Sequence, residues 1–226
     1  MRFQDAARDA RAVVYSGIQA DPQVARSAAL LADATPAQRV LARAVMNGET
    51  TEPGPWRAMF PSLFGSSASG GDAERARSGA ILEASLAVAE RGEQVRSQVR
   101  GALVEELAAQ LLARRVGAGA VRRERRVLFD GVRAEIHPYD VTVEQDGAAE
   151  VYDCKWGARG INGDVLHQLD DARTHAADED ERLAVALVVF DARRSCDVRL
   201  AHQTAPFERT AIVTLETLTE LAEPRR

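Results

Sequence analysis

Two Asp-Gly pairs that separate three short runs of alternating apolar and polar residues constrain the fold of this 226-residue chain most strongly. The pairs stand at 130–131 and 146–147, and the runs they divide cover residues 122–131, 132–147 and 148–157. Asp-Gly favours the tight turns that join antiparallel strands. The pattern therefore predicts a meander of three strands with a hairpin at each pair.

Helical patterns lie on both sides of this predicted meander. Apolar residues recur every three or four positions from Asp72 to about Arg115, which predicts a long amphipathic helix with a break near Gly92 or Gly101. After the meander, residues 161–177 again favour a helix.

The C-terminal part adds strands to the same sheet. Residues 183–192 form an unbroken apolar run, which is typical of a strand buried on both faces. Short strands are expected near 197–202 and 210–213, followed by a helix over 215–223. The predicted fold class is α/β (α+β), with a mixed central sheet flanked by helices.

The first part of the chain, residues 1–72, is predicted to be a separate α-helical region. Asp21-Pro22 and Thr35-Pro36 each combine an N-cap residue with a proline in the first helical turn. Residues 48–72 are rich in glycine, serine and proline and predict a linker. We therefore expect a helical N-terminal domain over 1–72 and a second domain over 73–226.

Bulk properties limit the class of protein. The chain has no run of 18 apolar residues, and its N-terminus lacks an apolar signal core, so a cytoplasmic protein is expected. Cys154 and Cys196 fit no metal or redox spacing and are predicted to be free thiols. The net charge of −5 argues against a generally cationic nucleic-acid coat, so any nucleic-acid contact needs a local basic face or a partner.

Lys155 is the only lysine among 29 basic residues, and the other 28 are arginines. Arginine can replace lysine wherever a solvated positive charge is enough. A guanidinium is planar, bulky and permanently charged, and so it cannot replace a compact ammonium beside a pair of carboxylates. The single lysine therefore indicates a local chemical task.

Two aspartates are predicted to lie beside this lysine. Asp153 and Lys155 are two positions apart on one strand and so share a face. Asp140 and Asp153 are equally distant from the centre of the Asp146-Gly147 turn, which makes them near-opposite partners across the hairpin. Buried carboxylates need a cation between them, and one or two carboxylates with a substrate phosphate suit Mg²⁺.

The preceding helix carries Glu105 and Glu106. The stripe formed by Leu103 and Leu107 lets one of these glutamates face the sheet, with Glu105 preferred. With a glutamate on a helix, an aspartate on a strand and Asp-x-Lys on the next strand, residues 97–215 resemble the PD-(D/E)XK nuclease superfamily, which has the restriction-endonuclease-like fold.

This resemblance implies a site and an activity. It implies that Asp140, Asp153 and the backbone carbonyl of Cys154 hold Mg²⁺ (or Mn²⁺), that Glu105 contacts the metal through water, and that Lys155 orients or deprotonates the attacking water. Gln168 matches a glutamine found on the following helix in some branches. The tyrosine that accompanies it in one branch is replaced here by Ala172.

Basic residues near the first strand are candidates for phosphate contacts, namely Arg122, Arg123, Arg125 and Arg126. The alternative is an edge strand protected by its charges. Together these features predict a Mg²⁺-dependent DNA endonuclease of a restriction or phage-defence type, with DNA as substrate and a homodimer or protein partner contacted through the N-terminal helices. RNA as substrate and a non-catalytic nuclease-fold subunit that binds nucleic acid or protein remain the alternatives.

Overall fold

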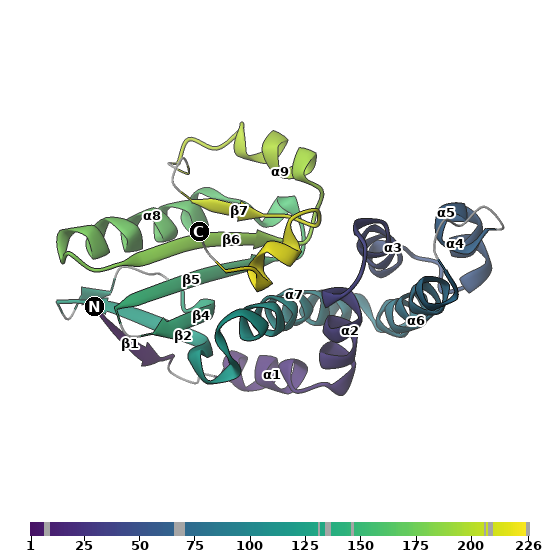
Figure 1. Cartoon of the computed structure of the whole chain (residues 1–226), viewed down its shortest axis with the longest axis horizontal. Helices are drawn as coiled ribbons and strands as arrows, with labels where there is room; N and C mark the ends of the chain where they lie inside the picture. Colours follow the sequence, from purple (N-terminus) through teal and green to yellow (C-terminus); the bar gives the residue numbers. More distant parts are fainter. Residues whose placement is uncertain are drawn as a thin grey trace. The chain divides into compact units, whose positions relative to one another are not determined.

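The computed structural model describes residues 1–6, 10–65, 71–130, 132–133, 137–145, 147–205, 207 and 210–224 (Figure 1). It divides into two compact units, of which one contains residues 1–11 and 108–226 and the other residues 12–107. We call them the sheet unit and the helical unit. Among the described helices, none combines the length and the hydropathy of a membrane span.

The sheet unit is built on a mixed seven-stranded sheet with the order β1-β2-β4-β5-β6-β7, in which β3 also pairs with β2 (Figure 1). The strands from β1 to β5 pair antiparallel, and β6 and β7 continue parallel to β5. The strands are β1 Arg2–Asp5, β2 Val121–Phe129, β3 Val132–Arg133, β4 Tyr139–Gln145, β5 Ala148–Lys155, β6 Leu183–Val189 and β7 Ala211–Val213. The predicted α/β class is confirmed.

Helices connect the parallel strands. Helix α8 (Gly163–Asp178) joins β5 to β6, and α9 (Arg193–Leu200) joins β6 to β7. Leu166 and Leu169 of α8 pack in one apolar cluster with Val151 and Leu187 of the sheet. This cluster fixes one face of the central strands.

The structure corrects three predicted elements. The run expected as one second strand is divided into β3 and β4. Residues 197–202 are not a strand, because α9 occupies Arg193–Leu200 and buries Cys196 and Leu200, which are four positions apart. The final helix is shorter than expected and is the 3₁₀ helix η3, Leu218–Ala222. The first residue of the Asp146-Gly147 turn and the second of the Asp130-Gly131 turn lie outside the described residues.

The helical unit contains α2 to α6 and parts of α1 and α7. Their bounds are α1 Ala10–Gln19, α2 Pro22–Ala32, α3 Pro36–Asn47, α4 Pro53–Met59, α5 Pro61–Phe64, α6 Asp72–Ala89 and α7 Glu93–Val116. Both predicted N-caps are confirmed, since Asp21 accepts the amide of Gln23 and Thr35 forms a capping box with Gln38. The long helix is broken at residues 90–92, close to Gly92 as predicted.

The division between the units does not fall at residue 72, where the sequence predicted a domain boundary. Helix α6 packs against α2 and α3, so residues beyond 72 belong with the N-terminal helices. The predicted linker contains α4 and α5, which bury Trp56 and Leu63. Residues 66–70 of that segment lie outside the described residues.

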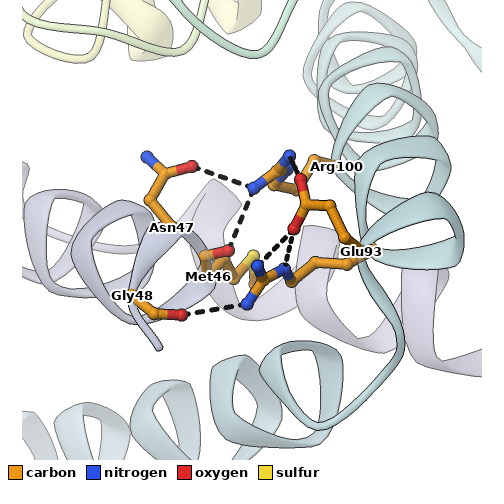
Figure 2. Close-up of polar contacts among 6 residues, drawn as sticks. Met46, Asn47, Gly48, Glu93 and Arg100 are labelled. Atoms are coloured by element: carbon orange, nitrogen blue, oxygen red, sulfur yellow. Dashed lines mark hydrogen bonds and ion pairs between the residues drawn. The ribbon is translucent and has the colours of Figure 1, made fainter. Parts of the chain in front are cut away.

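Arginines from one helix cap the C-terminal end of another in this unit. Arg96 donates to the carbonyl of Gly48 at 2.9 Å. Arg100 donates to that of Met46 at 3.2 Å (Figure 2). Glu93 accepts from both arginines. The hydrogen bond from Arg96 has the largest effect on the pKa of Glu93 and lowers it; burial opposes this, and the charges of Arg100 and Arg96 lower the pKa further. The cations thus satisfy carbonyls that the end of α3 leaves without helical partners.

Arg39 performs the same task at the end of α2. Its side chain is 1% exposed, and its guanidinium donates to the carbonyls of Leu31 at 3.2 Å and Ala32 at 3.4 Å. We expect Arg39→Met to lower the free energy of unfolding by about 2 kcal/mol, because buried carbonyls lose their donors. Urea unfolding measures this, with Arg26→Met on the exposed face of α2 as the control; equal stabilities for the two variants would contradict the capping role.

Candidate active site

The β4–β5 hairpin places the two predicted aspartates at the point where its strands separate. Val141 pairs with Tyr152, and the ladder ends at this pair. One position further along both strands, the same register sets Asp140 opposite Asp153, as the sequence predicted. At this position, a side chain of β4 and not its backbone forms the hydrogen bond to β5.

That side chain is Asp140. Its Oδ2 accepts the backbone N–H of Cys154 at 2.6 Å. A carboxylate that accepts a backbone N–H is held by a charge-assisted hydrogen bond. Asp140 is thereby fixed beside the Asp153-Cys154-Lys155 segment.

Asp153 and Lys155 form an ion pair on the neighbouring strand, through Oδ1 and Nζ. Asp153 is only 5% exposed, and its Oδ1 is inaccessible to solvent. The side chain of Lys155 is 26% exposed. Lys155 therefore reaches from a buried partner to the surface of the site, and Asp153 and Lys155 share a face as predicted.

Burial of the ammonium acts to lower the pKa of Lys155, but the charges of Asp140 and then Asp153 outweigh it and raise the pKa well above its ordinary value. Lys155 is accordingly a cation at neutral pH.

Glu124 also lies at this site, although the sequence did not single it out. The β2–β4 register pairs Arg123 with Val141 and Arg125 with Tyr139, which sets Glu124 opposite Asp140. Carboxylate oxygens of Glu124 and Asp140 lie within 4.8 Å of each other. The only signal in the sequence was that Glu124 is the single acidic residue in the arginine-rich run 122–126.

The backbone of Glu124 is unusual for a strand. Its φ is +52°, in the left-handed region that few residues other than glycine adopt. Its carbonyl accepts the N–H of Ala6 at 3.0 Å, so the segment after β1 helps to hold this conformation. Strained backbone of this kind concentrates at functional sites.

Gln168 contacts the backbone before β4 with both atoms of its amide. Its Oε1 accepts the N–H of His137 at 3.1 Å, and its Nε2 donates to the carbonyl of His137 at 3.0 Å. Tyr139 donates its hydroxyl to the carbonyl of Gln168 at 3.2 Å. Gln168, which the sequence suggested as a catalytic residue, thus fixes the segment that leads to Asp140.

Glu105 belongs to the helical unit and is buried there, whereas Glu106 is half-buried. Tyr15 donates its hydroxyl to Oε1 of Glu105, and Gln19 donates its amide to Oε2 at 2.8 Å. Glu105 is therefore the more enclosed of the two glutamates considered from the sequence. Its contact with a metal through water stays a prediction.

The four arginines of β2 have different surroundings. Arg125 pairs with Glu144, with Nε to Oε1 at 2.7 Å, and with Asp5 of β1. The hydrogen bond that Arg125 donates to Glu144 is the largest contribution to the raised pKa of Arg125. Arg122 is exposed, and Arg123 and Arg126 are half-buried. β1 pairs with β2 over 125–128, so the alternative of β2 as an edge strand fails along that part.

Both cysteines are free, as predicted, and both are buried. The carbonyl of Cys154 as a metal ligand stays a prediction. No protein-family model, curated protein or solved structure matches this chain.

Proposed function

We propose that the sheet unit is a divalent-metal-dependent phosphodiester hydrolase of the PD-(D/E)XK type with a restriction-endonuclease-like fold, and that it cleaves DNA as an endonuclease. One observation supports this proposal most: Asp140, Asp153 and Lys155 lie close together where the pairing of β4 with β5 ends. A nuclease of this type requires these three groups on adjacent strands.

The formal charge of the site supports a divalent ion. Glu124, Asp140 and Asp153 bring three carboxylates to this partly buried place, beside the ammonium of Lys155. Carboxylates that lie close together away from water are stabilised when a cation is shared between them. A bound Mg²⁺ would supply such a cation.

The spacing of the donors also suits Mg²⁺. Carboxylate oxygens of Glu124 and Asp140 lie within 4.8 Å of each other, which is near enough for one octahedral Mg²⁺ to be held by both. Asp140 would be the central ligand, with Asp153 or Glu124 as the second carboxylate. When bound, the metal would lower the pKa of a coordinated water and offset charge on the phosphate.

The protein's own residues would then place the substrate. Lys155 would orient the attacking water and stabilise negative charge on the scissile phosphate. Gln168 would act indirectly, through the backbone of His137. Arg122 is the most available arginine of β2 for a phosphate contact, because Arg125 is already ion-paired.

One observation favours the alternative of a non-catalytic nuclease-fold subunit that binds nucleic acid or a protein. Asp153 is already paired with Lys155, and Asp140 already accepts the N–H of Cys154. A site that has lost its metal would retain such internal pairs.

Cleavage of supercoiled plasmid, measured with Mg²⁺ and with EDTA, separates the two candidates. Nicked or linear product that requires Mg²⁺ supports the hydrolase. Plasmid binding without product, together with no Mn²⁺ binding by calorimetry, supports the binding subunit. Replacing the plasmid by a structured RNA tests the choice of DNA, and Glu105→Gln tests the predicted role of the helix glutamate.

A further inference from the structure

Gly160 lies against the side chain of Lys155, in the connection between β5 and α8. A Cβ atom added at Gly160 would be 2.9 Å from Cβ of Lys155 and 3.0 Å from its Cγ and Cδ. These distances are shorter than carbon atoms in van der Waals contact accept. The φ of Gly160 lies outside the left-handed region, so the requirement for glycine here is one of space.

Neither side of this contact can move easily. Lys155 ends the central strand β5, pairs with Val189 of β6, and accepts the N–H of Phe190 at 2.8 Å through its carbonyl. Gly160 ends the 3₁₀ turn η2 (Ala158–Gly160), and Oδ2 of Asp191 accepts the N–H of Ala158 at 3.0 Å. Both partners are therefore held by the residues that end and follow β6.

The turn itself is also closed by backbone hydrogen bonds. Gly160 donates its N–H to the carbonyl of Gly157 at 2.9 Å, and Ile161 donates to that of Ala158 at 3.1 Å. A methyl group at position 160 could be accommodated only by rotating the stem of Lys155 or by breaking this turn.

We propose that Gly160 is a positioning residue for Lys155. Because Gly160 has no side chain, it leaves the space in which the lysine stem lies, and the ammonium is thereby directed to Asp153. The catalytic part of this inference rests on the proposed function. The geometric part does not, since it concerns only where the lysine side chain lies.

The test compares Gly160→Ala with Gly163→Ala. Gly163 is the first residue of α8, and an added Cβ there meets no atom within 4 Å. For Gly160→Ala we expect kcat for plasmid cleavage to fall about 10- to 100-fold with little change in KM, because a small misplacement of a catalytic group has effects of this size. Gly163→Ala is expected to cleave like the wild type.

A second readout is independent of activity. Because Lys155 is the only lysine, ¹⁵N-lysine labelling gives a single side-chain ammonium signal in NMR spectra. This signal is expected to shift in Gly160→Ala and to stay in place in Gly163→Ala. If Gly160→Ala fails to fold, the same contact is tested by its thermal stability in the Lys155→Gly background, where Cβ, Cγ and Cδ are all absent and a smaller loss is expected.

The outcomes separate the two proposals. A shifted lysine signal in a chain whose wild type does not cleave DNA would support the positioning role and overturn the nuclease. An unshifted signal with full cleavage by Gly160→Ala would overturn the positioning role and leave the nuclease intact. If Gly160→Ala does not fold, an equal loss of stability in the Lys155→Gly background would overturn the positioning role.

Discussion

Replacing Asp140 with asparagine is expected to reduce Mg²⁺-dependent plasmid cleavage by about 10³-fold. Asparagine keeps an oxygen that can accept the N–H of Cys154, so the separation of β4 and β5 is retained. It removes the negative charge that would hold the metal. The expected loss therefore comes from the chemistry and leaves the fold in place.

The measurement is the initial rate of plasmid nicking, with circular dichroism to confirm the fold. Asp197→Asn is the matched control, because Asp197 lies on α9, is half-exposed and pairs only at the surface with Arg193. Its cleavage rate is expected to equal that of the wild type. Asp140→Asn with an undiminished rate would exclude Asp140 as a metal ligand and, with it, the proposed site.

The part of this site carried by β4 and β5 could be predicted from the sequence because a tight turn fixes register by symmetry. Residues equally distant from the Asp146-Gly147 pair face each other, and the pairing of Val141 with Tyr152 follows that rule. Alternation along a strand then places Asp153 and Lys155 on one face.

Glu124 could not be found in the same way. The Asp130-Gly131 turn fixes only β2 and β3, where Leu128 pairs with Arg133. Continuing that register would set Asp140 opposite Val121, whereas β4 pairs with β2 in a different register, which sets Asp140 opposite Glu124. A connection without a turn signature carries no such information in its sequence.

Similar limits explain the other differences. A strand was expected near 197–202, but Val198 is 56% exposed, and the buried residues Cys196 and Leu200 have helical spacing. The segment after Asn47 was interpreted as a linker because it is rich in glycine, serine and proline. Its prolines stand at the first turns of α4 and α5, and a proline at that position is also a signal for the start of a helix.

Replacing Lys155 with methionine is expected to lower the free energy of unfolding by about 3 kcal/mol, because a buried carboxylate loses its cation. Methionine keeps an unbranched stem beside Gly160, so the loss reports on the charge and not on packing. Urea unfolding measures it, and Asp153→Asn in the same chain is expected to restore part of the loss, because the unpaired charge is then removed as well.

The pH dependence has a defined sign. The folded-state pKa of Lys155 is raised above its unfolded value, so the ion pair contributes its full stability below about pH 10.4. On the alkaline side, that contribution is lost as the pH rises through the raised pKa. The stability difference between the wild type and Lys155→Met is therefore expected to be constant around neutral pH and to shrink in strong alkali.

Lys155→Arg separates charge from shape. Arginine keeps a positive charge on the same first three carbons, so it is expected to retain more stability than methionine. Its planar guanidinium is too large for the place that the ammonium occupies between Asp140 and Asp153, and cleavage is expected to be lost. An arginine variant that cleaves DNA like the wild type would mean that a solvated positive charge is enough at this position. The retention of one lysine in a chain with 28 arginines would then need a different explanation.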